Sequence, residues 1–169
     1  MGPDLHLRHA IAEDAPHLEH LYRELVPGDD AISVSPQRLV DLTEDAHNLL
    51  LVAAQDSVVV GSAFLTLCPD PMYGFQPYGL VENVVVAPTM RSTRIGDAMM
   101  MALRDVGLVT GCSKLMLLSN SQRARAHAFF RRCGFDGDAK RGFVLYRRDF
   151  ASGRTPPLMP PEPPAGTSA

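Results

Sequence analysis

Two stretches of the chain carry residue types that could do chemistry. Residues 91–96 read Arg-Ser-Thr-Arg-Ile-Gly and run directly into an apolar segment with helical spacing. Backbone N–H groups at the start of a helix, assisted by arginine, bind phosphate oxygens. Glu82 stands in the otherwise apolar run 80–88, where a carboxylate could act as a general base. The sequence therefore predicts a phosphate-binding turn beside a proton acceptor.

Each feature also has a plainer interpretation. The turn could be an ordinary strand-to-helix connection with solvated arginines. Glu82 could point to a solvated face of the sheet or pair with an arginine. We expect instead that Glu82 is partly buried among the valines, as suits a tuned general base.

The elements that position these residues follow from hydrophobic periodicity. The expected strands are 5–10, 48–55, 57–68, 80–88, 114–120 and 142–150. The expected helices are 11–26, 35–45, a segment that carries Ile95 and ends at Gly111, and 122–135. Ser35 followed by Pro36 is a typical cap and first-turn pair, and Gly134 is a typical C-terminal cap. This order predicts an α/β (α+β) fold with one mixed sheet and flanking helices.

Composition narrows the function classes. The chain has 169 residues, of which 46% are hydrophobic and 21% charged, as in a single globular domain. We expect a domain at 1–150 and a proline-rich tail at 151–169 that cannot fold alone. The N-terminus has no apolar signal region, and three widely spaced cysteines fit reduced thiols. These features predict a cytoplasmic protein without a membrane span or a metal site.

Charge is distributed unevenly. Residues 1–90 contain 3 basic and 13 acidic residues, a net charge of −10. Residues 91–148 contain 12 basic and 4 acidic residues, a net charge of +8. The first segment suits a cationic ligand and the second an anionic one, although the two segments could also simply attract each other. Nucleic-acid binding is not expected, because no aromatic-basic pattern accompanies the arginines.

The motifs together resemble the GNAT superfamily of acyl-CoA-dependent N-acetyltransferases. The loop of that family reads Gln/Arg-x-x-Gly-x-Gly/Ala, and here it is Arg91-Ser92-Thr93-Arg94-Ile95-Gly96. "RARAHAFFRRCGF" (123–135) is similar to the family's next helix, and "VENVVV" (81–86) to its central strand. The resemblance implies a mostly antiparallel twisted sheet that splays at its central strands.

The same resemblance implies acetyl-CoA as acyl donor and a set of cofactor-binding residues. Its pyrophosphate would lie on the backbone of 91–98, and its pantetheine arm would pair with the strand at Val84 to Val86. The implied residues are Val84, Val85, Val86, Arg91, Ser92, Thr93, Arg94, Ile95, Gly96, Asp97, Ala98 and Arg123. Arg123 and Arg125 could reach the ribose phosphate or form a solvated face.

Two positions depart from the family pattern. Arg94 replaces a glycine, and we expect it to be tolerated because the position could already be helical. Phe130 replaces the tyrosine that protonates the leaving thiolate. Tyr146, Tyr73, Tyr78 or water could replace it, and we take Tyr146 as the candidate acid beside Glu82 as the candidate base. His127 is interpreted as a packed or cap-bound histidine.

The resulting prediction is an N-acetyltransferase that acts on a small-molecule primary amine by direct attack. The alternatives are a protein or peptide N-acetyltransferase and a non-catalytic acyl-CoA-binding module. Six acids in regions that line the acceptor pocket in the family predict a cationic or zwitterionic acceptor: Asp29, Asp30, Asp41, Glu44, Asp45 and Asp70. A homodimer is left open.

Overall fold

The computed structural model describes residues 5–150, and these divide into two compact units. The first extends to Gly137 and contains the sheet. The second begins at Asp138, and each unit is described by itself. The tail expected at 151–169 lies outside the described residues. No helix in the described part of the chain is long and apolar enough to cross a membrane.

The first unit is built on a five-stranded sheet in the order β1-β2-β3-β4-β5. The strands are β1 (Leu5–His9), β2 (Asn48–Gln55), β3 (Val58–Cys68), β4 (Tyr78–Val86) and β5 (Leu115–Leu117). Neighbours pair antiparallel except β4 and β5, which run parallel. This confirms the predicted mixed, mostly antiparallel sheet with flanking helices.

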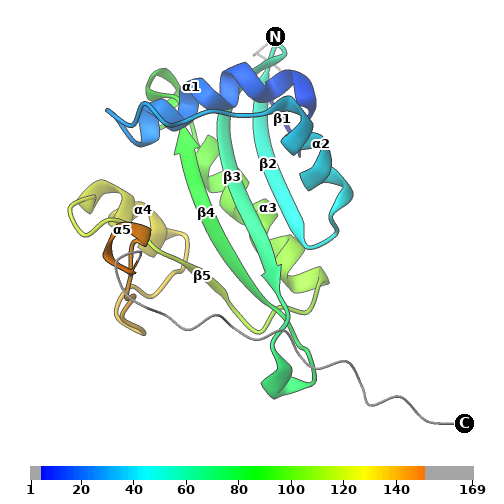
Figure 1. Cartoon of the computed structure of the whole chain (residues 1–169), viewed down its shortest axis with the longest axis vertical. Helices are drawn as coiled ribbons and strands as arrows, with labels where there is room; N and C mark the ends of the chain where they lie inside the picture. Colours follow the sequence, from blue (N-terminus) through cyan, green and yellow to red (C-terminus); the bar gives the residue numbers. More distant parts are fainter. Residues whose placement is uncertain (1–4, 151–169) are drawn as a thin grey trace, which may run out of the picture. The chain divides into compact units, whose positions relative to one another are not determined.

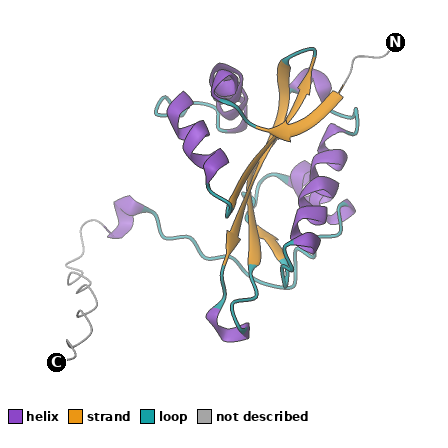
Figure 2. Cartoon of the chain, turned by 90° about the vertical axis from the view of Figure 1, so that its right-hand side faces the viewer, coloured by secondary structure: helices purple, strands orange, loops and turns teal. Residues whose placement is uncertain are grey.

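Helices cover both faces of the sheet (Figures 1 and 2). They are α1 (Ala15–Leu25), α2 (Pro36–Glu44), α3 (Ile95–Val109) and α4 (Ala124–Arg132), with short 3-10 turns at Ala12–Asp14, Pro71–Tyr73 and Pro88–Met90. The expected cap of α2 is present, because Ser35 Oγ accepts from the Arg38 N–H at 3.4 Å. α1 and α2 pack on one face, and α3 lies on the other.

Two apolar clusters fill the space between these layers. Leu18 and Leu21 of α1 pack with Val52 and Val85 on one face of the sheet. Met99 and Leu103 of α3 pack with Leu65 and Val81 on the other face, together with Phe129 and Phe130 of α4. The alternation of side chains along each strand therefore assigns every β4 residue to one of the two faces.

β4 and β5 lie together only at the start of β4. Their pairing covers Gly79 to Val81 against Leu115 to Leu117. A Cβ atom on Gly79 would overlap the side chains of Leu115 and Leu65, so glycine permits this approach. Beyond Val81 the pairing stops, which is the splay that the resemblance implied.

α4 ends in a Schellman motif. The N–H of Gly134 donates to Arg131 O and the N–H of Phe135 to Phe130 O, each at 3.0 Å, with Gly134 at φ +94°. Phe135 also packs edge-on against Phe130, with ring centroids 6.2 Å apart. The sequence therefore identified the end of this helix correctly.

The structure of the second unit differs from the sequence prediction in one element. The strand predicted at 142–150 is absent, because residues 141–146 have no regular structure and Arg147–Phe150 form a short helix, α5. β propensity alone does not make a strand, since an extended segment also needs a partner strand. Within this unit the Arg148 guanidinium lies over the Tyr146 ring, 4.6 Å from its centroid.

Candidate active site

A groove of about 1430 Å³ runs along the C-terminal half of β4, between the start of α3 and α4. Nearly all of the predicted cofactor residues line it: Val84, Val85, Val86, Arg91, Ser92, Arg94, Ile95, Gly96, Asp97, Ala98 and Arg123. Thr93 does not line it, and its hydroxyl donates to Met90 O. The structure thus gathers at one site residues that the sequence selected by motif.

The groove exposes a free strand edge. The Ala87 N–H donates to Val60 O at 2.8 Å, and Ser62 is the register partner of Val85. Because paired residues alternate along an antiparallel ladder, Val84 and Val86 direct their peptide groups away from β3. No strand among the described residues pairs with β4 on that side beyond Val81. An extended, amide-containing ligand could pair there as an additional strand.

A β-bulge lies at the N-terminal end of this free edge of β4. Four residues of β4, from Glu82 to Val85, face three of β3, from Phe64 to Ser62. Asn83 takes up the extra residue at φ +52°, a left-handed conformation that asparagine tolerates better than most residues. The bulge reverses the alternation, so that Val84 lies on the α3 side and Val85 on the α1 side.

The first turn of α3 supplies free backbone donors. The first intrahelical bond runs from the Ala98 N–H to Arg94 O at 3.0 Å. The N–H groups of Ile95, Gly96 and Asp97 precede it and have no helical acceptor. They lie in the groove wall, where the positive end of the helix dipole favours an anion.

The backbone at Arg94 does not have the right-handed helical conformation that the sequence analysis expected. It has φ +67° and ψ +7° as the residue before α3, which is the left-handed region that favours glycine. Ser92 lies in the same region at φ +71°. Arginine is tolerated here at a conformational cost, and the family's glycine is explained by backbone geometry.

Arginine side chains surround the groove. Arg91, Arg94, Arg123 and Arg125 line it, and none of them forms an ion pair with another described residue. Arg132 is different, because its Nη2 lies 3.1 Å from Asp97 Oδ1. The positive charge of this segment is therefore available to an anionic ligand, as the charge distribution predicted.

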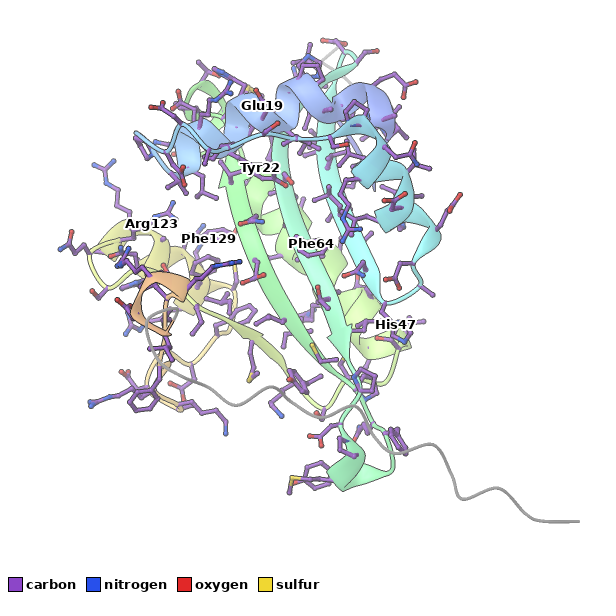
Figure 3. The ribbon with its side chains drawn as sticks, in the orientation of Figure 1. Glu19, Tyr22, His47, Phe64, Arg123 and Phe129 are labelled. Atoms are coloured by element: carbon purple, nitrogen blue, oxygen red, sulfur yellow. The ribbon has the colours of Figure 1, made fainter. Side chains whose placement is uncertain are left out.

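Phe129 and Phe130 form the α4 wall of the groove. Figure 3 shows Arg123 and Phe129 beside β4, at the α4 end of the site. Phe130 packs against Phe129 at 5.3 Å between ring centroids and offers no hydroxyl to the groove. His127 Nε2 lies 2.9 Å from Asn120 O, so His127 holds the start of α4, as interpreted from the sequence.

Glu82 does not have the expected burial. Its side chain is exposed, whereas Val85, three residues later, is buried in the α1-side cluster. Its register partner is Phe64, which packs against the α1-side cluster. Glu82 therefore lies on the α1 side of the sheet, on the opposite side from α3, and outside the groove lining.

Sequence reasoning missed the contribution of α1. Glu24 and Leu25, at the end of that helix, line the groove beside Val84 to Val86. The Glu24 side chain forms no hydrogen bond or ion pair with other described residues. No local signal in the sequence indicated it, because α1 is distant in sequence from the motifs.

A smaller pocket of about 290 Å³ lies on the α1 side of the bulge, and we call it the side pocket. It is lined by Tyr22, Leu25, Val26, Asp29, Ala31, Ile32, Ser33 and Asn83. Leu25 belongs to both cavities, and Asn83 adjoins Val84 of the groove. Burial raises the pKa of Tyr22, and a hydrogen bond of 3.4 Å with Ser62 Oγ opposes that effect.

Only one of the six expected acidic residues lines the side pocket. Asp29 does, whereas three others have structural partners: Asp41 pairs with Arg38 at 3.7 Å, Asp45 accepts from Asn48, and Asp70 caps the turn at Met72. The other five acids do not line the side pocket, and their role in binding an acceptor stays a prediction.

Tyr146, the candidate acid, belongs to the second unit. Its ring contacts Arg148 there, and its role stays a prediction.

Comparisons with known proteins agree with this geometry. The model of the acetyltransferase (GNAT) family matches residues 14–135, which is more than half of the chain. A glucosamine 6-phosphate N-acetyltransferase of Trypanosoma brucei brucei is 34% identical over 77 residues. That match covers 46% of this chain and 50% of the relative, so the chain spans about half the length of the curated relative that it matches.

Solved structures share the fold over most of the chain. A proposed acetyltransferase from Agrobacterium tumefaciens has a TM-score of 0.76 at 27% identity, covering 83% of this chain and 99% of that one. An aminoglycoside N-acetyltransferase solved in complex with CoA has a TM-score of 0.71 at 20% identity, covering 87% and 97%. At 20% identity the second likeness shows the fold alone.

Proposed function

Because the chain belongs to the acetyltransferase (GNAT) family, we propose that it transfers an acetyl group from acetyl-CoA to a primary amine of a small molecule. Membership confirms the resemblance predicted from the motifs and, at the level of the family, an acetyl-CoA-dependent N-acetyltransferase. The acceptor and the individual site residues belong to the proposal.

The observation that carries the proposal is the pairing of two binding features in one groove. The free edge of Val84 and Val86 suits the amides of a pantetheine arm, and the start of α3 suits a pyrophosphate. Acetyl-CoA contains both groups and supplies an activated acetyl group. Asp97 would contribute its N–H only, because its carboxylate pairs with Arg132.

The chemistry needs one bond formed and one broken. The amine nitrogen gives its lone pair to the thioester carbon, and the C–S bond breaks as the thiolate leaves with its electrons. The Val84 N–H, which points away from β3, would donate to the oxygen where negative charge develops. Glu82 would take the proton that the amine loses, directly or through water. Tyr146 or water would protonate the thiolate.

A small-molecule acceptor is favoured over a protein one by the size of the side pocket. Its volume of about 290 Å³ lies just below the range of small-molecule sites, which span about 300–1,000 Å³, and so suits a very small acceptor. The glucosamine 6-phosphate N-acetyltransferase that matches half its length to this chain also acts on a small amine.

The decisive experiment measures release of CoA thiol from acetyl-CoA in the presence of single amines, with products identified by mass spectrometry. We expect acetylated product from at least one small primary amine and none from peptide N-termini or lysines. Transfer to peptides alone would contradict the acceptor class. Tight CoA binding without transfer to any amine or peptide would identify a non-catalytic binding module.

A further inference from the structure

The side pocket lies where an acceptor must approach the reacting bond. Leu25 lines both this pocket and the groove, and Asn83 of the pocket is covalently joined to Val84 of the groove. A ligand seated in the side pocket would therefore place one end at the bulge, on the opposite side of the sheet from the phosphate-binding turn. Figure 3 shows Tyr22, a pocket residue, on the α1 side of the sheet with Phe64.

The residues that line the side pocket include both aliphatic side chains and a single charged one. Its walls include the aliphatic side chains of Leu25, Val26 and Ile32, which suit a hydrocarbon body. Asp29 is the single carboxylate among the lining residues, and no arginine, lysine or histidine lines the pocket. The pocket therefore combines three aliphatic side chains and the polar groups of Tyr22, Ser33 and Asn83 with one negative charge.

Asp29 is held in place. Its Oδ1 accepts from the Ala31 N–H at 3.0 Å, and Asp29 forms no ion pair with another described residue. One carboxylate oxygen thus remains available for a ligand cation, because a carboxylate has acceptor capacity on both oxygens.

The outer wall of the pocket is fastened to α1. Glu19 Oε2 accepts from the Val34 N–H at 3.0 Å, and Arg23 donates to Ile32 O at 3.2 Å. Arg23 also pairs with Glu19 at 2.7 Å. The segment that carries Asp29 is therefore braced at its far end, and binding needs little further ordering of that segment.

From this arrangement we infer that the acceptor is a short aliphatic diamine, with one amine at the bulge and the second, still protonated, on Asp29. This inference rests on the proposed function and specifies its acceptor. A far-end carboxylate or phosphate would meet Asp29 with like charge and find no basic partner in the pocket. A simple monoamine would contact the aliphatic side chains but leave the carboxylate unpaired.

The test compares three acceptors of equal chain length: putrescine, butylamine and γ-aminobutyrate. Initial rates give kcat and KM for each with saturating acetyl-CoA. Because Asp29 is exposed, we expect kcat/KM for putrescine to exceed that for butylamine by about fivefold, near the upper limit for an exposed ion pair, and γ-aminobutyrate to be the poorest. The preference should weaken as salt is raised.

Two neighbouring substitutions make the test specific. Asp29→Asn should raise KM for putrescine about fivefold, leave kcat nearly unchanged, and leave butylamine unaffected. Asp30→Asn removes the same charge from a residue that lines neither cavity, and it should change nothing. Thermal shift by putrescine in the presence of CoA reports binding independently of turnover, and Asp29→Asn should reduce it.

The outcomes separate the inference from the proposed function. Equal use of putrescine and butylamine, or equal effects of Asp29→Asn and Asp30→Asn, would overturn the diamine assignment while leaving an amine acetyltransferase. Preference for γ-aminobutyrate or a phosphorylated amine would also overturn it. No transfer to any amine, with CoA bound, would overturn the proposed function and this acceptor with it.

Discussion

The ring of Phe129 in α4 lies against Gly96 in the first turn of α3, and a Cβ atom on Gly96 would stand 3.1 Å from two carbons of that ring. The contact joins the two helices that form the walls of the groove. It also explains the glycine at this position by helix packing, in addition to the approach of a phosphate to the backbone.

Gly96→Asp should abolish binding of CoA, because it adds a negative charge at the predicted phosphate site and pushes on Phe129. Gly96→Asn is the matched control, since it adds nearly the same volume without charge. We expect Gly96→Asn to bind more weakly than wild type and Gly96→Asp more weakly still, as measured by calorimetry at low salt. If Gly96→Asp bound CoA with wild-type affinity, the CoA site would not lie at this turn.

Arg94→Gly should be tolerated, because glycine adopts φ +67° without the penalty that arginine carries. Arg94→Ala keeps the conformational penalty and removes the guanidinium. We expect urea unfolding to give a higher free energy of unfolding for the glycine variant than for the alanine variant, by about 1 kcal/mol. Equal stabilities would mean that the left-handed conformation costs little here.

The Arg94→Gly and Arg94→Ala variants also test whether the charged side chain of Arg94 contacts a phosphate of CoA. If the Arg94 side chain reaches a phosphate, both variants should lose CoA affinity to the same extent, and both should lose part of the salt dependence. If only its backbone serves the site, the glycine variant should bind CoA as well as wild type.

Glu82→Gln should lower turnover by about a hundred- to ten-thousand-fold, the usual value of a positioned general base. Affinity for acetyl-CoA should change little, because Glu82 lies outside the groove lining and on the α1 side of the sheet. The loss should shrink at high pH, where more of the amine is already neutral.

Glu24→Gln is the informative comparison for that experiment, because Glu24 lines the groove and has no described partner. We expect it to retain most activity. If turnover fell strongly in Glu24→Gln and stayed normal in Glu82→Gln, the general base would be Glu24 of α1 and not Glu82.

Asp14→Asn should destabilise the fold by about 1.5–3 kcal/mol, since it removes charge-assisted hydrogen bonds. Asp14 has a side chain only 4% exposed and accepts from Arg8 at 2.6 and 2.9 Å and from the Ile11 N–H at 2.8 Å. Urea unfolding at neutral pH measures the difference, and Asp30→Asn serves as an exposed control.

The pH dependence of that contribution has a defined sign. Burial alone would raise the pKa of Asp14, but the hydrogen bonds from Arg8 and Ile11 outweigh it and the pKa is lowered. A carboxyl with a lowered folded-state pKa stabilises the fold above its unfolded value of about 3.9. The stabilisation should therefore be complete at neutral pH and disappear as the pH falls below that value. A pH-independent difference between wild type and Asp14→Asn would contradict it.

Local patterns in the sequence were enough to predict most of the elements and the end of α4. The reason is that caps and turns depend on neighbouring residues: Ser35 caps α2, and Gly134 closes α4 by bonds to residues within one turn. The strand expected at 142–150 failed because its formation depends on a partner that the local sequence does not encode.

The motif also predicted which residues gather in the groove, because a strand, a turn and a helix that are adjacent in sequence stay adjacent in space. What only the tertiary structure decided was the exposure of Glu82, the left-handed backbone of Arg94, the presence of Glu24 in the groove, and which of the six expected acids lines the side pocket. Each depends on packing between segments distant along the chain. The assembled layers determine which side chains are buried, which backbone conformation precedes α3, and where α1 meets the β4 bulge. Hydrophobic periodicity in the sequence does not determine how those layers pack together.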